Sequence, residues 1–166
     1  IEVSKKTNAP ATAALLPDGQ IVTGKTSSLL GATSAMLLNA LKTIAGIDDS
    51  VKLISPSVIS PIQHLKTEHF GSKNPRLHTN EVLLALSISA ATDENARKAM
   101  DALQYLRGCE VHSTVILSSV DSDTLSKLGI NVTCEPEREK EIFSTDKTRC
   151  CTCLLYTSPS PRDLST

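Results

Sequence analysis

Three of the four histidines of this chain lie in one segment, which reads HLKTEHFGSKNPRLH over residues 64–78. This segment and the helix start that follows it also hold basic, amide and carboxylate side chains: Lys66, Glu68, Lys73, Asn74, Arg76 and Glu81. Cations on a loop beside a helix N-terminus favour anion binding, because charges and backbone N–H groups attract the same ligand. We predict that residues 64–81 bind a small anionic or phosphorylated ligand through Lys66, Lys73, Asn74 and Arg76.

Acid–base chemistry is the second possibility in this segment. Histidine titrates near neutral pH, so His69 or His78, together with Glu68, are the candidate catalytic residues. The ordinary alternative is a solvated loop whose polar side chains only hold it to its neighbours. A metal site made of these three residues is not predicted, because their spacing is not diagnostic. The residues specify neither a reaction nor a cofactor.

A second candidate site lies at residues 19–26, which read GQIVTGKT and fit the P-loop pattern G-x-x-x-x-G-K-[ST]. In a P-loop, Lys25 and Thr26 would bind the phosphates and Mg²⁺ of a nucleotide. However, Gln20-Ile21-Val22 is typical of a strand rather than of an exposed loop. Pro17-Asp18-Gly19 before it is typical of a hairpin turn. We favour a hairpin of Thr12–Leu16 with Gln20–Thr23, and keep nucleotide binding as an alternative.

The hairpin leads into a long helix with one charge, Lys42, which begins near Ser27 or Ser28 and ends at Gly46. A helix that is apolar on most sides is buried on most sides, so we expect it to form the core. Further along we expect strands at 51–54, 111–117 and 130–134. Helices are expected from Ser60-Pro61 to His69, over 82–91, from 92 to 107 and over 121–128. Ser118 and Ser119 end a strand where open α/β sheets bind ligands, and a helix cap explains them equally well.

Strands separated by helices indicate an α/β fold in which a mostly parallel sheet is covered on both faces. With the N-terminal hairpin added as an antiparallel edge, we predict a three-layer sandwich with a mixed, mostly parallel sheet. We expect residues 1–143 to be a single α/β domain. Because the sequence begins at Ile1 rather than Met, we also expect it to be a fragment of a longer protein.

Composition limits the partners of this chain. A net charge of −1 gives no reason to expect nucleic acid or an anionic membrane, and 2% aromatic content leaves few residues to stack on bases. The sequence has no apolar run that could span a bilayer and no signal peptide, so we expect a cytoplasmic protein.

The last residues differ in character from the rest. Three of the five cysteines are Cys150, Cys151 and Cys153, and the final stretch CLLYTSPSPRD resembles the translation of a sequencing adapter. We therefore expect residues 144–166 to be a disordered, non-native tail. Cys109 and Cys134 then remain, which a reduced cytosolic protein tolerates.

Three stretches carry a resemblance to a known family: ALLPDGQIVTGKTSSLLGATSAMLLNALKTIAGI, LISPSVISPIQHLKTEHFGSKNPRLHTNEVLLALSISAATD and GCEVHSTVILSSVDSDTLSKLGINVTCEP. They resemble the C-terminal part of the bacterial family known as domain of unknown function eighteen-forty-six. The resemblance covers most of residues 1–136. It implies a cytosolic bacterial protein without an established activity, whose full chains are much longer.

The order of hairpin, buried helix, strand and helix also resembles the cytidine-deaminase-type sandwich. Those zinc enzymes carry His/Cys-x-Glu at the start of the buried helix and Pro-Cys-x-x-Cys at a later helix start. The corresponding places here read GATSA at 31–35 and SPIQH at 60–64, without a thiolate. The resemblance therefore implies the topology without the zinc chemistry. A further alternative is a structural or homo-oligomerisation module without its own activity, whose polar loop contacts a second subunit or the missing N-terminal region.

Overall fold

The computed structural model describes residues 10–135, and the opening hairpin forms as expected. Strand β1 is Ala11–Leu15, and strand β2 is Ile21–Lys25. They pair antiparallel, with Leu15 opposite Ile21. The turn between them closes at Gly19, whose φ of 89° suits a residue without a Cβ. Local turn chemistry therefore sets the register of the first two strands.

Strands β3 (Glu110–Ser113) and β4 (Asn131–Cys134) complete a mixed sheet in the order β2-β1-β3-β4. β1 pairs antiparallel with β3, and β3 pairs parallel with β4. Two of the three pairings are thus antiparallel, which corrects the expectation of a mostly parallel sheet. The physical reason is that β1 takes the central place between its hairpin partner and β3.

The strand expected at residues 51–54 does not form. Leu53 and Ile54 are buried in the core, but they precede a helix rather than joining the sheet. Their apolar character therefore reflects burial against helices, which a short apolar run cannot distinguish from a strand. The element order shared with the deaminase sandwich consequently holds for the hairpin and the buried helix, but not for this strand.

Helix α2 (Ala32–Ala45) is the centre of the core. It contacts β1 and β2 on one side and α4 (Thr79–Ser89) and α5 (Glu94–Asp101) on the other. Leu37, Ala40 and Leu41 have no exposed surface. Burial on two sides explains why this helix has a single charged residue. It begins at Ala32, after the N-cap Gly31, rather than near Ser27 or Ser28 as expected.

The remaining helices begin close to the expected positions, with one exception. Helix α3 (Pro56–His64) is capped by Ser55, so its start lies before Ser60-Pro61, and Pro61 is inside the helix. It continues into a π-helical turn, η1 (Leu65–His69). Helix α5 continues into the 3₁₀ turn η2 (Ala102–Leu106), and α6 (Ser119–Lys127) connects β3 to β4.

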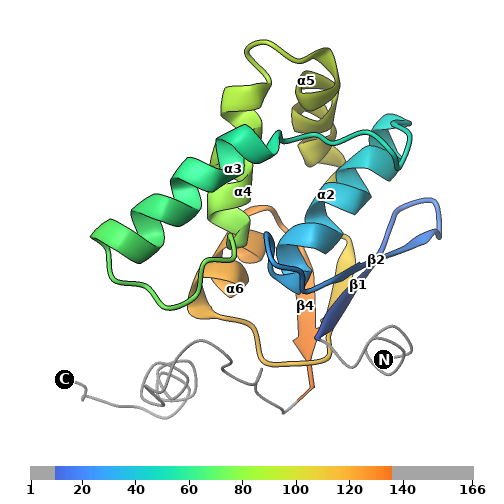
Figure 1. Ribbon diagram of the computed structural model, residues 1–166. Helices are drawn as coiled ribbons and strands as arrows, with labels where there is room; N and C mark the ends of the chain where they lie inside the picture. The colour runs from blue at the N-terminus through green and yellow to red at the C-terminus, as the bar shows by residue number, and fades with distance from the viewer. Residues whose placement is uncertain (1–9, 136–166) are drawn as a thin grey trace.

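The fold is α/β, with the sheet, the α2–α6 layer and the α3–α4–α5 layer stacked as three layers (Figure 1). Within residues 10–135 all five α-helices lie on one side of the sheet. Thr12, Ala14 and Val111 face these helices and are buried, whereas Leu15 and Ile21 face the other side and are 44% and 71% exposed. The expectation that helices cover both faces is therefore wrong for the described part of the chain.

Candidate functional site

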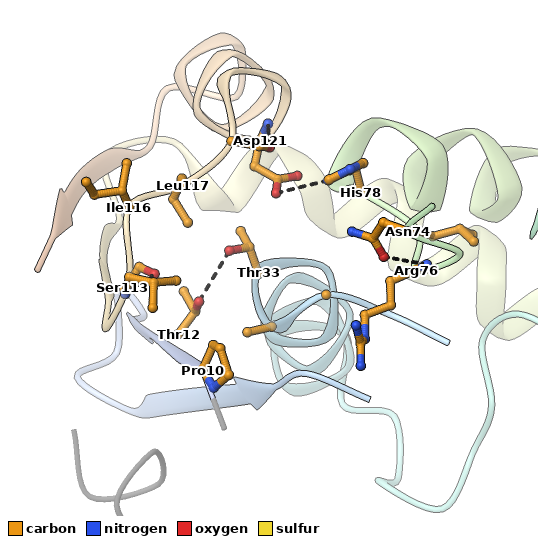
Figure 2. A pocket seen from close by; sticks show the side chains of 15 residues that line it. Pro10, Thr12, Thr33, Asn74, Arg76, His78, Ser113, Ile116, Leu117 and Asp121 are labelled. Atoms are coloured by element: carbon orange, nitrogen blue, oxygen red, sulfur yellow. Dashed lines mark hydrogen bonds and ion pairs between the residues drawn. The ribbon is translucent and has the colours of Figure 1, made fainter. Parts of the chain in front are cut away.

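A polar cavity of about 60 Å³ lies where β1, β3 and the N-terminal ends of α2, α4 and α6 meet. Its lining includes Thr12, Thr33, Asn74, Arg76, His78, Ser113, Ser118 and Asp121. Figure 2 shows Asn74, Arg76 and His78 on one side, Thr12 and Ser113 on the other, and the end of α2 between them. A space of this size holds a few water molecules or one small polyatomic group, rather than a whole nucleotide.

The loop before α4 is held in shape by its own side chains. Ser72 Oγ accepts the N–H of Asn74 at 3.3 Å, and Asn74 Oδ1 accepts the N–H of Arg76 at 3.0 Å. The next residue, Leu77, is fully buried and exchanges backbone hydrogen bonds with Leu29 and Gly31. These contacts fix the backbone that carries Asn74 and Arg76 against the start of α2.

Arg76 extends from this loop toward the segment between β2 and α2. Its Nε donates to the backbone oxygen of Ser27. The side chain is half-buried and lines the cavity. Arg76 therefore places a permanent positive charge beside the first turn of α2.

His78 and Asp121 form the charged pair of the cavity. His78 Nδ1 lies 3.4 Å from Asp121 Oδ2 (Figure 2). Asp121 Oδ1 accepts the N–H and the hydroxyl of Thr79 at 2.9 and 2.8 Å. The carboxylate thereby caps α4 from a neighbouring helix, which satisfies a donor that the helix itself cannot pair.

This arrangement shifts both titrations. The hydrogen bond to Asp121 raises the pKa of His78 above its ordinary value, although burial acts in the opposite direction. Burial alone would raise the pKa of Asp121, but the bonds from His78 and Thr79 outweigh it and hold that pKa below its ordinary value. The pair is therefore stabilised as imidazolium and carboxylate.

The N-terminus of α2 is the one helix start at the cavity that no side chain within residues 10–135 caps. Its N-cap is Gly31, which has no side chain, whereas Ser118 caps α6 by accepting the N–H of Asp121. Donors of an uncapped first turn attract an acceptor or an anion. Thr33 on this turn bonds to Thr12 of β1 at 3.2 Å, which joins the helix to the sheet.

The other predicted site residues of the 64–81 segment do not line the cavity. Lys66 is 7% exposed, and its ammonium donates to Glu81 at 2.9 Å and to the backbone oxygen of Arg76. It therefore fixes the loop to α4 in this structure. Glu68, His69 and Lys73 are exposed and do not line the cavity. Of the predicted residues, the structure brings together Asn74, Arg76 and His78.

The P-loop alternative is contradicted by the structure. Residues 21–25 are strand β2, and their backbone pairs with β1 instead of forming a loop around phosphate. Gly24 has a different role, because a Cβ there would lie 2.1 Å from the backbone nitrogen of Met36. Lys25 is exposed on β2, and Thr26 follows the strand. The glycine therefore allows close packing of β2 on α2.

Asp121, Thr12, Thr33 and Ser113 were not singled out from the sequence. Ser118 and Asp121 have the spacing of a helix cap, and that pattern correctly marks the start of α6. The same spacing does not predict that Asp121 bonds to Thr79, because Thr79 is far away along the chain. Of the two explanations offered for Ser118, the helix cap is confirmed, because its Oγ accepts the N–H of Asp121 at the start of α6. The strand expected over 111–117 ends at Ser113, so Ser118 does not end a strand, although it lines the cavity.

These observations define an α/β domain with a one-sided helical cover and a small polar cavity at the helix starts. The chain belongs to the family described as "Domain of unknown function DUF1846, C-terminal", whose model matches residues 1–143. It is 61% identical over 141 residues to a UPF0371 protein of Corynebacterium efficiens, and 59% identical over 139 residues to one of Corynebacterium diphtheriae. These matches cover 85% and 84% of this chain.

A UPF0371 protein of Streptococcus thermophilus is 56% identical over 133 residues, or 80% of this chain. The family is therefore shared by distant bacterial groups and has no assigned function. The chain spans only about 28% of the length of the corynebacterial relatives and 27% of the streptococcal one. Within residues 10–135, no helix is both long and apolar enough to cross a membrane.

Proposed function

We propose that this domain binds a small anionic group, a phosphate or a carboxylate, in the cavity at the start of α2. The observation that carries the proposal is the uncapped first turn of α2, which lines the cavity beside the guanidinium of Arg76. Backbone donors and a nearby cation together favour a bound anion.

Three further features support this binding mode. The hydrogen bond to Asp121 raises the pKa of His78 and so favours its charged form, which offsets the carboxylate of Asp121. Asp121 Oδ1 already accepts two hydrogen bonds from Thr79, so this oxygen is not available to repel an incoming ligand at close range. Asn74 adds an amide on the same side as Arg76. In this proposal Arg76 and Asn74 bind the anion and His78 donates to it.

The test replaces the proposed ligand with a side chain of the protein. In Gly31→Asp, the new carboxylate caps α2 and occupies the proposed position of the anion. Gly31→Ala is the matched control, since a Cβ at Gly31 meets only one atom within 4 Å, at 3.9 Å. Inorganic phosphate is added to each protein, while the melting temperature and the amide NMR signals of Ala32 and Thr33 are recorded.

We expect phosphate to shift these two amide signals and to stabilise the parent and Gly31→Ala proteins. The stabilisation is about 1.4 kcal/mol at a concentration tenfold above Kd. Gly31→Asp should gain roughly a few tenths of a kcal/mol without phosphate and lose the response to it. Arg76→Ala should weaken the response. A response that is unchanged in Gly31→Asp, or no response in the folded parent, would refute the proposal.

A further inference from the structure

The face of the sheet opposite the helices carries exposed apolar side chains at its β1–β2 end. We call it the open sheet face, and it comprises Ala13, Leu15, Ile21, Glu110, His112, Asn131 and Thr133. These residues line a shallow groove of about 380 Å³ across all four strands. Ile21 and Leu15 are opposite each other in the β1–β2 pair, so two exposed apolar side chains lie together.

Strand β1 carries apolar residues on the side away from the helices, and Thr12 on the helix side is its one polar residue. It is central in the sheet and reads ATAAL, with Leu16 directly after it. A strand with one solvated face alternates apolar and polar residues, whereas a strand covered on both faces is apolar throughout. On the helix side this pattern is explained by α2, but on the other side nothing within residues 10–135 covers Leu15 and Ile21.

The half of the open sheet face on β3 and β4 is polar and ordered by its own contacts. His112 bonds to Thr133 at 2.8 Å through Nδ1 and to Glu135 at 3.1 Å through Nε2. A surface that is apolar at one end and hydrogen-bonding at the other is typical of an interface between domains of one protein.

We propose that the open sheet face is the docking surface for the N-terminal part of the full-length proteins of this family. The matching family model is that of the C-terminal domain, and the chain spans about 28% of its corynebacterial relatives. Most of each relative therefore lies outside the matched region, and it is joined to this domain covalently. A covalently joined domain is the occupant at the highest local concentration, which favours it over a second copy.

The test compares this chain alone with a chimaera in which its residues replace the matching 28% of the Corynebacterium efficiens relative. Both unmodified proteins are footprinted with a carbene reagent and analysed by mass spectrometry. We expect labelling of Leu15 and Ile21 to fall by about tenfold in the chimaera, as for an interface that opens only transiently. Equal labelling in the two proteins would overturn the proposal.

A matched pair of variants provides the second readout. Leu84 on α4 is 63% exposed, close to the 71% of Ile21, so Leu84→Asp is the control for Ile21→Asp. In the chain alone, both variants should melt within a few degrees of the parent. In the chimaera, Ile21→Asp should lower the melting temperature and speed proteolysis between the two parts, whereas Leu84→Asp should not.

Two outcomes would overturn the choice of occupant. One is equal sensitivity of the chimaera to Ile21→Asp and Leu84→Asp. The other is a dimer of the chain alone that Ile21→Asp dissociates, since this would assign the open sheet face to a second copy. If Ile21→Asp does not fold in the chimaera, the footprint of the unmodified proteins still decides the question.

Discussion

At the scale of single residues, the cavity depends on how Asp121 is shared among its partners. One carboxylate receives the N–H and hydroxyl of Thr79 and the ring of His78. A buried carboxylate is tolerated when such donors satisfy it. Because three groups at the start of α4 converge on Asp121 of α6, the starts of these two helices hold each other in place.

The His78–Asp121 pair predicts a particular pH dependence of stability. The pKa of His78 is raised in the folded state, so its contribution is fully present below its unfolded value of about 6.5. That contribution is lost as the pH rises through the higher folded value. The pKa of Asp121 is lowered, so its contribution is present above its ordinary value and is lost as the pH falls through the folded value.

We therefore expect the free energy of unfolding of the parent protein to decrease as the pH rises above about 6.5, the unfolded value of His78. In His78→Gln this decrease should be absent, and the variant should be less stable than the parent below that pH. Urea unfolding at several pH values measures both quantities. The same slope in the parent and in His78→Gln would show that another group causes the pH dependence.

At the scale of elements, the packing of β2 on α2 depends on Gly24. A Cβ at this position would lie 2.1 Å from the nitrogen of Met36 and 2.6 Å from the oxygen of Ala32. Both are backbone atoms of the central helix, so a rotamer change cannot relieve the contact. The hairpin and α2 would have to separate to accept even one methyl group.

Gly24→Ala should accordingly destabilise the domain by about 3 kcal/mol, at the upper end of the range for overpacked cores. Gly31→Ala is the control because its Cβ has space, so it should cost less than about 1 kcal/mol. Chemical denaturation of both variants measures the difference. Equal stability of the two would contradict the close approach of β2 and α2.

At the scale of the whole molecule, the layered arrangement places α2 at the centre. The sheet covers one side of this helix, and α4 and α5 cover the other. Local opening requires few lost contacts at a surface element, but at α2 it requires separation of two layers. Opening of α2 therefore requires the same free energy as global unfolding of the domain.

Native-state hydrogen exchange should reflect this arrangement. The amides of Leu37, Ala40 and Leu41 should exchange only through global unfolding, and their exchange should follow the unfolding free energy as denaturant is added. Amides of α3 and of the loop after it should exchange through smaller openings, because Ile59 is the one buried residue of α3. Exchange of α2 before α3 would contradict the layer order.

Elements that depend on neighbouring residues were predictable from the sequence. Pro17-Asp18-Gly19 closes the hairpin through local turn geometry, and Gly46 ends α2 with a φ of 70°. The apolar character of α2 correctly indicated burial on most sides. The strand at 51–54, the mostly parallel sheet and the helices on both sheet faces were predicted wrongly, because each depends on partners far away along the chain.

The sequence by itself determined the turns, most helix starts and the presence of a buried central helix, because each depends on residues a few positions apart. It also indicated a polar segment from which Asn74, Arg76 and His78 line the cavity. Only the tertiary structure decided that Lys66 pairs with Glu81, that Gly24 packs on Met36, and that Asp121 joins Thr79 and His78. These contacts form when distant segments pack together, so local patterns carry no signal for them.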